Sequence, residues 1–282
     1  MRMRGRPQRR RQAVTQLMED ARIEWSPNEI EELRYARELL ENPGLAARLT
    51  NLIGMPIEKG FELLPDRWRD TVQEVTQVSL RKCLSAALKT MGDPSSGSRS
   101  YEFAHKVAVA GTGAAGGFFG FPALAFELPV STGIMLRSIA DVARSEGENI
   151  LSVEARLACL EVFALGGRSS SDDASEHGYF VIRGALARSV TEAAEYIVEK
   201  GLAEEGAPVL VRFIARIASR FSLTVSEKAA AQAVPAIGAA GGALVNTLFI
   251  AHFQNTARGH FVVRRMERKY GPDEVRMMYE LL

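Results

Sequence analysis

The sequence predicts an all-α protein built as a single multi-helix domain. Helix-capping residues precede several segments, apolar residues recur every three or four positions, and no alternation of period two persists along the 282 residues. Two glycine-rich apolar stretches, residues 107–136 and 229–257, dominate the pattern. We expect each stretch to form a helical hairpin. A weak internal repeat is expected to relate the two, because both contain Gly-Ala-Ala-Gly-Gly.

The first helices are predicted from their start and stop signals. Ser26 and Glu29 flank Pro27 and form a capping box, so a helix is expected from there to about Glu41. Glycine and proline residues separate the next helices, and Ser152 is expected to cap a later one. Each of these signals is local, since the residues concerned lie within one helical turn of each other.

Prolines shape the expectation for the two apolar stretches. Pro129 predicts a break, with a helix that begins only after it. Ser226 predicts the start of a long helix that is kinked at Pro235 and ends at Tyr270. The expected helices cover residues 27–41, 45–53, 66–91, 130–146, 152–165, 179–200, 208–221 and 226–270, with a short helix after Gly271.

The charges divide the chain into two regions. Residues 1–25 read as a basic, disordered tail, and residues 26–282 as the folded domain. Without the six arginines among the first eleven residues, the formal net charge of +1 becomes −5, so the body is a poor surface for nucleic acid. The tail could instead hold the protein near an anionic membrane surface. The arginines expected to lie there are Arg9, Arg10 and Arg11.

Neither a metal site nor a cofactor is expected. Cys83 and Cys159, the two cysteines, lie far apart in helical patterns, which indicates neither a disulfide framework nor zinc and favours a cytoplasmic protein. His252 and His260 are eight residues apart on one expected helix, about 12 Å along its axis, and cannot share an ion. His177 lies in a loop of acidic and small residues whose composition is that of a solvated turn.

The first apolar stretch contains a literal dinucleotide-binding fingerprint, from Gly111 through Gly113 to Gly116. Pro122 would cut the helix that should hold the pyrophosphate, and no second parallel strand follows, so nucleotide binding is the weaker interpretation. Residues 107–126 could span a bilayer core, but their glycines and proline favour a buried hairpin. Small residues four apart let helices approach closely. Such pairs are Gly113 with Gly117, Gly116 with Gly120 and Gly238 with Gly242.

Glu127 is the only formal charge between Lys106 and Arg137. A carboxylate in an apolar run must be paired, protonated or exposed to water. Two interpretations stay open: a buried acid paired with a basic group or a helix N-terminus, and a polar site in an apolar groove. The expected basic partners are His105, Arg137 and Arg258. The expected ligand or lipid groove contains Glu127, Gly113, Gly117, Gly238, Gly242 and Asn246.

Over roughly residues 50–280 the chain resembles the EcsC family, named for a protein encoded beside an ABC transporter. One departure is Glu127, where such proteins typically have aspartate before Leu-Pro, and the loop of residues 168–177 is irregular. The residues that carry the resemblance are Gly54-Met55-Pro56-Ile57-Glu58, the glycine-rich run with Leu128-Pro129, Arg137, Ile139, Ala143, Gly147, Val234-Pro235, Gly238-Ala239, Gly242-Ala243, Asn246, Phe249, Ala257, Phe261 and Tyr270-Gly271.

The resemblance implies a helical, cytoplasmic protein linked to membrane transport, without a catalytic mechanism to carry over. We therefore expect a non-enzymatic, membrane-associated accessory or lipid-contacting protein at the inner face of the membrane. Its expected partner is an anionic membrane surface or a membrane transporter. The rival hypothesis is a hydrolase-type enzyme that uses Glu127 with a histidine such as His105 or His252.

Overall fold

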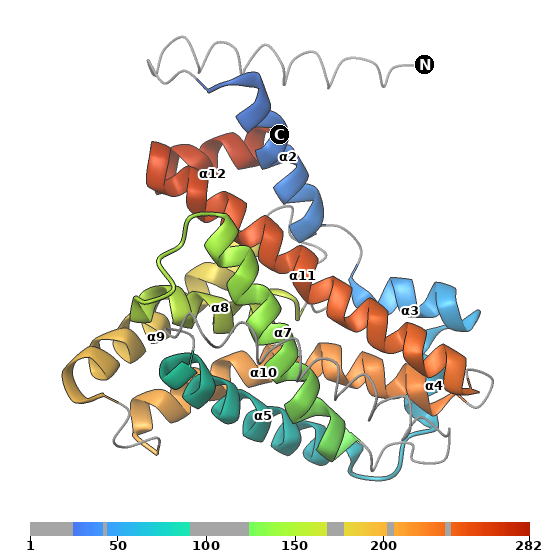
Figure 1. Cartoon of the computed structure of the whole chain (residues 1–282). Coiled ribbons are helices and arrows are strands. Elements are labelled where there is room, and N and C mark those ends of the chain that lie inside the picture. Colours follow the sequence, from blue (N-terminus) through green and yellow to red (C-terminus); the bar gives the residue numbers. More distant parts are fainter. Residues whose placement is uncertain (1–24, 42–43, 91–123, 168–177, 202–205, 235–237) are drawn as a thin grey trace, which may run out of the picture.

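The described part of the chain consists of α-helices (Figure 1). The computed structural model describes residues 25–41, 44–90, 124–167, 178–201, 206–234 and 238–282. These residues form ten helices and contain no strand, which confirms the all-α prediction. The helices are α2 (Pro27–Glu41), α3 (Leu45–Ile53), α4 (Ile57–Glu62), α5 (Trp68–Thr90), α7 (Leu124–Ser145), α8 (Val153–Leu165), α9 (Gly178–Lys200), α10 (Pro208–Ala233), α11 (Gly238–Tyr270) and α12 (Pro272–Leu281).

Two helices begin at the capping residues that the sequence predicted. The backbone N–H of Glu29 donates to Ser26 Oγ at 3.3 Å, and the Ser26 N–H donates back to the Glu29 carboxylate at 3.1 Å. This reciprocal pair satisfies two backbone donors at the start of α2. At α8, Ser152 Oγ accepts from the N–H of Ala155 at 3.2 Å.

The predicted break at Pro129 is wrong, because α7 begins at Leu124 and contains this proline. Proline lacks an N–H and therefore deletes one helical hydrogen bond, but here the loss falls within the first two turns. Directly before Pro129, the carbonyl of Leu128 accepts from two side chains, Ser131 Oγ at 3.2 Å and Thr132 Oγ1 at 2.6 Å. The helix thus continues through the proline and carries Glu127 in its first turn.

For the predicted long helix from Ser226 to Tyr270, the start is wrong, whereas the end at Tyr270 is confirmed. Ser226 lies inside α10, where its hydroxyl donates to the carbonyl of Ser222 at 2.6 Å instead of capping a new helix. A serine can make this bond to the preceding turn as well as a capping bond, so its presence alone did not fix a helix start. The helix α10 ends at Ala233, and α11 is a separate helix that begins at Gly238.

The short helix α4 was not expected from the sequence, which offered only a glycine–proline break before it. Gly60 lies in α4 against α10, and a Cβ atom at this position would be 2.4 Å from the carbonyl oxygen of Ala230. Close packing against another helix therefore stabilises a six-residue segment that is too short to be stable alone.

Two long helices organise the packing. The helix α10 contacts α3, α4, α5, α8, α9 and α11, and α11 also contacts α2, α7 and α12. In Figure 1, α11 runs across the molecule from α12 and α2 at one end to α3 and α4 at the other. Between these helices lies a buried cluster of aromatic rings with centroid separations from 4.9 to 6.2 Å. Its members are Phe163, Phe221, Phe249 and Phe253.

The described body begins at Trp25, which was expected to belong to the tail. Its ring is 5% exposed and stacks on Tyr270 with the centroids 4.1 Å apart. Residues 1–24 of the expected tail and residues 107–123 of the first expected hairpin lie outside the described residues. For this reason the disorder of the tail and the internal repeat stay predictions.

Candidate functional site

Glu127, Lys228 and Asn246 meet at a polar contact between three helices. The ammonium nitrogen of Lys228 on α10 lies 2.5 Å from Glu127 Oε1 on α7 and 3.0 Å from Asn246 Oδ1 on α11. Glu127 directly follows the uncharged residues 107–126, and Lys228 directly precedes the uncharged residues 229–257. The ion pair therefore joins the boundaries of these two uncharged segments.

Lys228 is the buried centre of this contact. Its side chain is 0% exposed, whereas that of Glu127 is 35% exposed. Burial lowers the pKa of Lys228, and the charge and hydrogen bond of Glu127 oppose this change. The ammonium group also lies 4.7 Å from the centroid of the Phe249 ring, whose face attracts cations. Glu127 and the half-buried Asn246 are consequently the parts of the contact that solvent or a ligand can reach.

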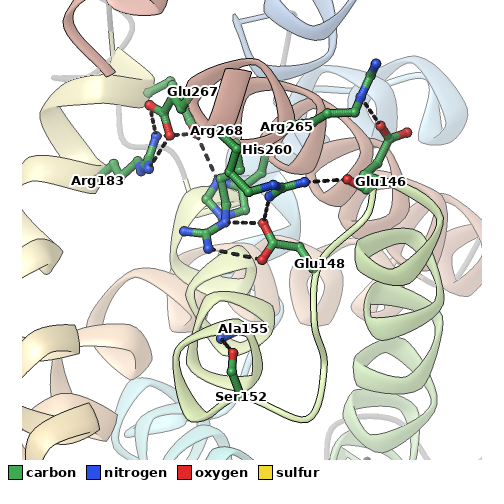
Figure 2. Close-up of polar contacts among 11 residues, drawn as sticks. Glu146, Glu148, Ser152, Ala155, Arg183, His260, Arg265, Glu267 and Arg268 are labelled. Carbon is green, nitrogen blue, oxygen red and sulfur yellow. Dashed lines mark hydrogen bonds and ion pairs between the residues drawn. The ribbon is translucent and has the colours of Figure 1, made fainter. Parts of the chain in front are cut away.

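A second polar cluster surrounds the C-terminal turns of α11 (Figure 2). Arg183 on α9 donates two hydrogen bonds to Glu267, at 2.6 and 2.7 Å. Arg264 donates two to Glu148 in the connection between α7 and α8, at 2.8 and 3.2 Å. Burial acts to raise the pKa of Glu148, but the hydrogen bonds and charges of Arg264 and Arg268 together outweigh it, and the pKa is lowered. Further pairs are Arg265 with Glu146 and Glu32, Arg268 with Glu148, and Lys269 and Tyr270 with Glu29.

Two buried titratable groups lie among these ion pairs. Glu161 on α8 is 4% exposed, and burial raises its pKa to about 7 although the charges of Arg183 and Arg264 oppose the change. His260 on α11 is 0% exposed; burial, together with the same two arginines, lowers its pKa well below 6.5. Its Nδ1 atom is 2.9 Å from the hydroxyl of Tyr179, and its Nε2 atom has no hydrogen-bond partner among the described residues.

Comparison with known proteins identifies the family of the chain. The model of the EcsC protein family matches residues 27–266. The chain belongs to this family. The match includes α2, which precedes the region of the resemblance found in the sequence, and it contains Glu127, Lys228 and Asn246. No curated protein and no solved structure matches this EcsC-family chain.

In the EcsC-family chain, the sequence identified Glu127 and Asn246 but not the lysine that joins them. The expected partners of Glu127 were His105, Arg137 and Arg258, and the partner in the structure is Lys228. His105 lies outside the described residues. Lys228 is the last charged residue before the second apolar stretch, and this position alone indicates no partner. Because 101 residues separate it from Glu127, no spacing rule could connect the two.

The histidines of the EcsC-family chain lie in separate surroundings. His252 Nε2 is 2.8 Å from the carbonyl oxygen of Gly166, whereas His260 contacts Tyr179. The contact that the structure gives Glu127 is with Lys228, and the hydrolase hypothesis, which names His105 or His252 as the histidine, stays a prediction. Among the described residues, no group of three or more His, Cys, Asp or Glu side chains could hold a metal ion. His177 lies outside them.

The glycines of the expected groove do not share one role. Gly238 is the first residue of α11, and Gly242 follows one turn later. Among the described residues, nothing would lie within 4 Å of a Cβ atom at Gly242, so no described helix approaches closely at this position. The remaining site residues, Gly113, Gly117, the fingerprint Gly111–Gly116 and Arg9, Arg10 and Arg11, lie outside the described residues.

A helix that crosses a bilayer must be long and apolar. Within the described ranges, none is both long enough and apolar enough to cross a bilayer. The long helices α7, α10 and α11 all carry a buried face and an exposed, partly charged face.

Proposed function

We propose that this chain is a non-enzymatic protein that associates with the inner face of a membrane, contacts lipid beside its glycine-rich segments and serves as an accessory in membrane transport. The link to transport rests on the EcsC resemblance. The single observation that carries the lipid contact is the ion pair of Glu127 with Lys228, which joins the boundaries of two uncharged segments at one place in the fold.

An uncharged segment of this composition gains free energy when its apolar surface leaves water, either in a protein core or in lipid. The second segment is partly buried in the protein core and partly exposed. Val245 and Phe249 on α11 are 0% exposed, whereas Leu244 is 52% exposed on the outer side of the same helix. Two turns of α11 near the Lys228 contact therefore offer apolar surface to a partner outside the described body.

The test is flotation of the full-length protein with protein-free liposomes of phosphatidylcholine and phosphatidylglycerol. We expect the protein to float and Leu244→Asp to weaken flotation, because the variant places a charge on the proposed contact surface. Leu151→Asp is the matched control, since Leu151 is 62% exposed but lies in the connection between α7 and α8. Equal flotation of both variants would show that Leu244 is not part of the lipid contact surface.

The same assay separates the two expected partners. Flotation with protein-free liposomes supports lipid as the partner. Binding to native membrane vesicles but not to protein-free liposomes would instead favour a membrane protein such as a transporter. No binding to either would refute the proposed function.

A further inference from the structure

One face of α10 carries basic residues without acidic ones. Between Gly206 and Ser226 the only charged residues are three arginines, spaced four residues apart, so each lies about one turn beyond the previous one on nearly the same side of the helix. Arg212 and Arg216 are exposed, and neither forms an ion pair with any described residue. The third arginine is Arg220, which is half-buried.

The neighbouring helix α9 adds a further arginine to this surface. Arg188 is 84% exposed and lies 2.7 Å from Glu192, also on α9. The hydrogen bond from Arg188 lowers the pKa of Glu192, and the charges of Arg212 and Arg216 act in the same direction. All three arginines therefore lie close enough to influence one carboxylate, and together they leave an excess of positive charge around it.

We propose that the arginine face, defined as Arg188, Arg212 and Arg216 with the apolar side chains of Val211 and Leu223, binds the phosphate groups of anionic lipids at a membrane surface. The inference rests on the proposed function and names the part of the body that would face the membrane. Guanidinium groups form paired hydrogen bonds with phosphate oxygens, and each basic residue near an anionic leaflet strengthens attraction to it.

The apolar side chains favour a membrane over other polyanions. Leu223 is 38% exposed and lies about two turns beyond Arg216 on the side of the arginines, whereas Val211 is 39% exposed and lies on the neighbouring side of α10, about 100° from Arg212. Basic and apolar side chains on one exposed helix face are typical of helices that lie in a membrane interface. Nucleic acid is the poorer fit, because its phosphate backbone offers no apolar surface to the exposed Leu223.

The experiment compares two double variants of the full-length chain with the same change in charge. Arg212→Gln with Arg216→Gln alters the arginine face, and Arg34→Gln with Arg276→Gln alters exposed arginines that already pair with Glu31 and Glu280. Both proteins keep the N-terminal arginines, so any contribution of these is the same. Partition is measured on vesicles of phosphatidylcholine with 30% phosphatidylglycerol and on pure phosphatidylcholine. Circular dichroism confirms that both variants are folded.

We expect the first double variant to lose roughly tenfold in partition on the anionic vesicles, since two basic residues are removed from the surface, while the control changes little. Neither variant should differ from the original protein on pure phosphatidylcholine. Arg212→Lys with Arg216→Lys should retain most of the binding, because the charge is kept.

If the two glutamine double variants lost vesicle partition equally, the arginine face would not be the membrane contact. The proposed function would still stand, because the unaltered protein would still float. If the lysine variant lost as much vesicle partition as the glutamine variant, attraction between opposite charges would not be the basis of binding by the arginine face. Binding of duplex DNA that needs Arg212 and Arg216, with vesicle partition unaffected, would assign the face to nucleic acid. Absence of vesicle binding by the unaltered protein would refute both the inference and the proposed function.

Discussion

At the scale of single residues, a fully buried ammonium group requires compensation, and Glu127 supplies the opposite charge to Lys228. Taking a lysine out of water costs several kcal/mol unless a counter-charge and hydrogen bonds replace the lost hydration. Asn246 provides one acceptor and the Phe249 ring a further favourable contact, but neither carries a charge. The stability of this junction should therefore depend on Glu127.

Glu127→Gln should lower the free energy of unfolding by roughly 1–3 kcal/mol at neutral pH, since it leaves the Lys228 ammonium without its counter-charge. The estimate is below that for a fully buried pair because Glu127 is partly exposed and solvent screens its charge. Urea titration of the variant measures the loss. Adding Lys228→Met should recover part of it. Unchanged stability of Glu127→Gln, together with lost vesicle binding, would instead mark Glu127 as a functional group.

Two separately buried groups, Glu161 and His260, lead to a prediction about the pH dependence of stability. Glu161 has a folded-state pKa of about 7 against 4.5 when unfolded, so its stabilising contribution is present below pH 4.5 and is lost as the pH rises toward 7. His260 has a lowered folded-state pKa, so its contribution is present above its usual pKa of 6.5 and is lost as the pH falls. Between about pH 4.5 and 6.5 the two slopes have opposite signs, and the two groups together should make the stability nearly independent of pH.

Single substitutions should reveal the two slopes. Glu161→Gln should become less stable as the pH falls from 6.5, because His260 alone remains, and at pH 8 it should exceed the original protein by up to about 3 kcal/mol. His260→Gln should instead lose stability as the pH rises from 4.5 to 7. Denaturant titrations at several pH values measure both effects. If stability changed with pH in the same way in all three proteins, Glu161 would not be protonated and His260 would not be neutral in the folded state, and the prediction would be wrong.

At the scale of elements, two glycines on α11 should respond oppositely to the same change. A Cβ atom at Gly242 would meet nothing within 4 Å, so Gly242→Ala should stabilise α11 by up to about 1 kcal/mol through its higher helix propensity. A Cβ atom at Gly259 would lie 2.9 Å from the backbone oxygen of Ala36 on α2, so Gly259→Ala should destabilise by about 1–3 kcal/mol. Thermal melts of both variants provide the comparison, and a loss of stability in Gly242→Ala would mean that an unrecognised contact covers this position.

The sequence predicted those elements whose signals lie within one turn and missed those decided by distant contacts. The capping box of Ser26 and Glu29 could be recognised because both partners are local. Ser226 has the same chemical possibilities as a cap, yet its position inside α10 depends on helix packing beyond it. For the same reason Glu127 could be singled out by its charge in an apolar run, but its partner Lys228 could not, since only the fold brings the two together.

At the scale of the whole molecule, the C-terminal turns of α11 hold several parts of the chain to one helix. Lys269 and Tyr270 both bond to Glu29 on α2, Arg183 on α9 bonds to Glu267, and Tyr270 also stacks on Trp25. Hydrogen bonds to its carboxylate lower the pKa of Glu29 to about 2. The bond from Lys269 has the largest effect, and the bond from Tyr270 has the next largest. The start of the described body is therefore fixed to its end by contacts that do not involve the first 24 residues.

Deleting residues 1–11 should accordingly leave the melting temperature nearly unchanged while weakening binding to anionic vesicles at low salt. The deletion removes six arginines and makes the formal net charge −5, which reduces attraction to an anionic surface. Higher salt should bring the intact protein toward the truncated one, because exposed charges are screened within about 8–10 Å at ordinary ionic strength. Vesicle flotation at two salt concentrations, with thermal melts of both proteins, makes the comparison. Equal vesicle binding with and without the eleven residues would show that the tail does not contribute to membrane association and that the folded body alone binds the membrane.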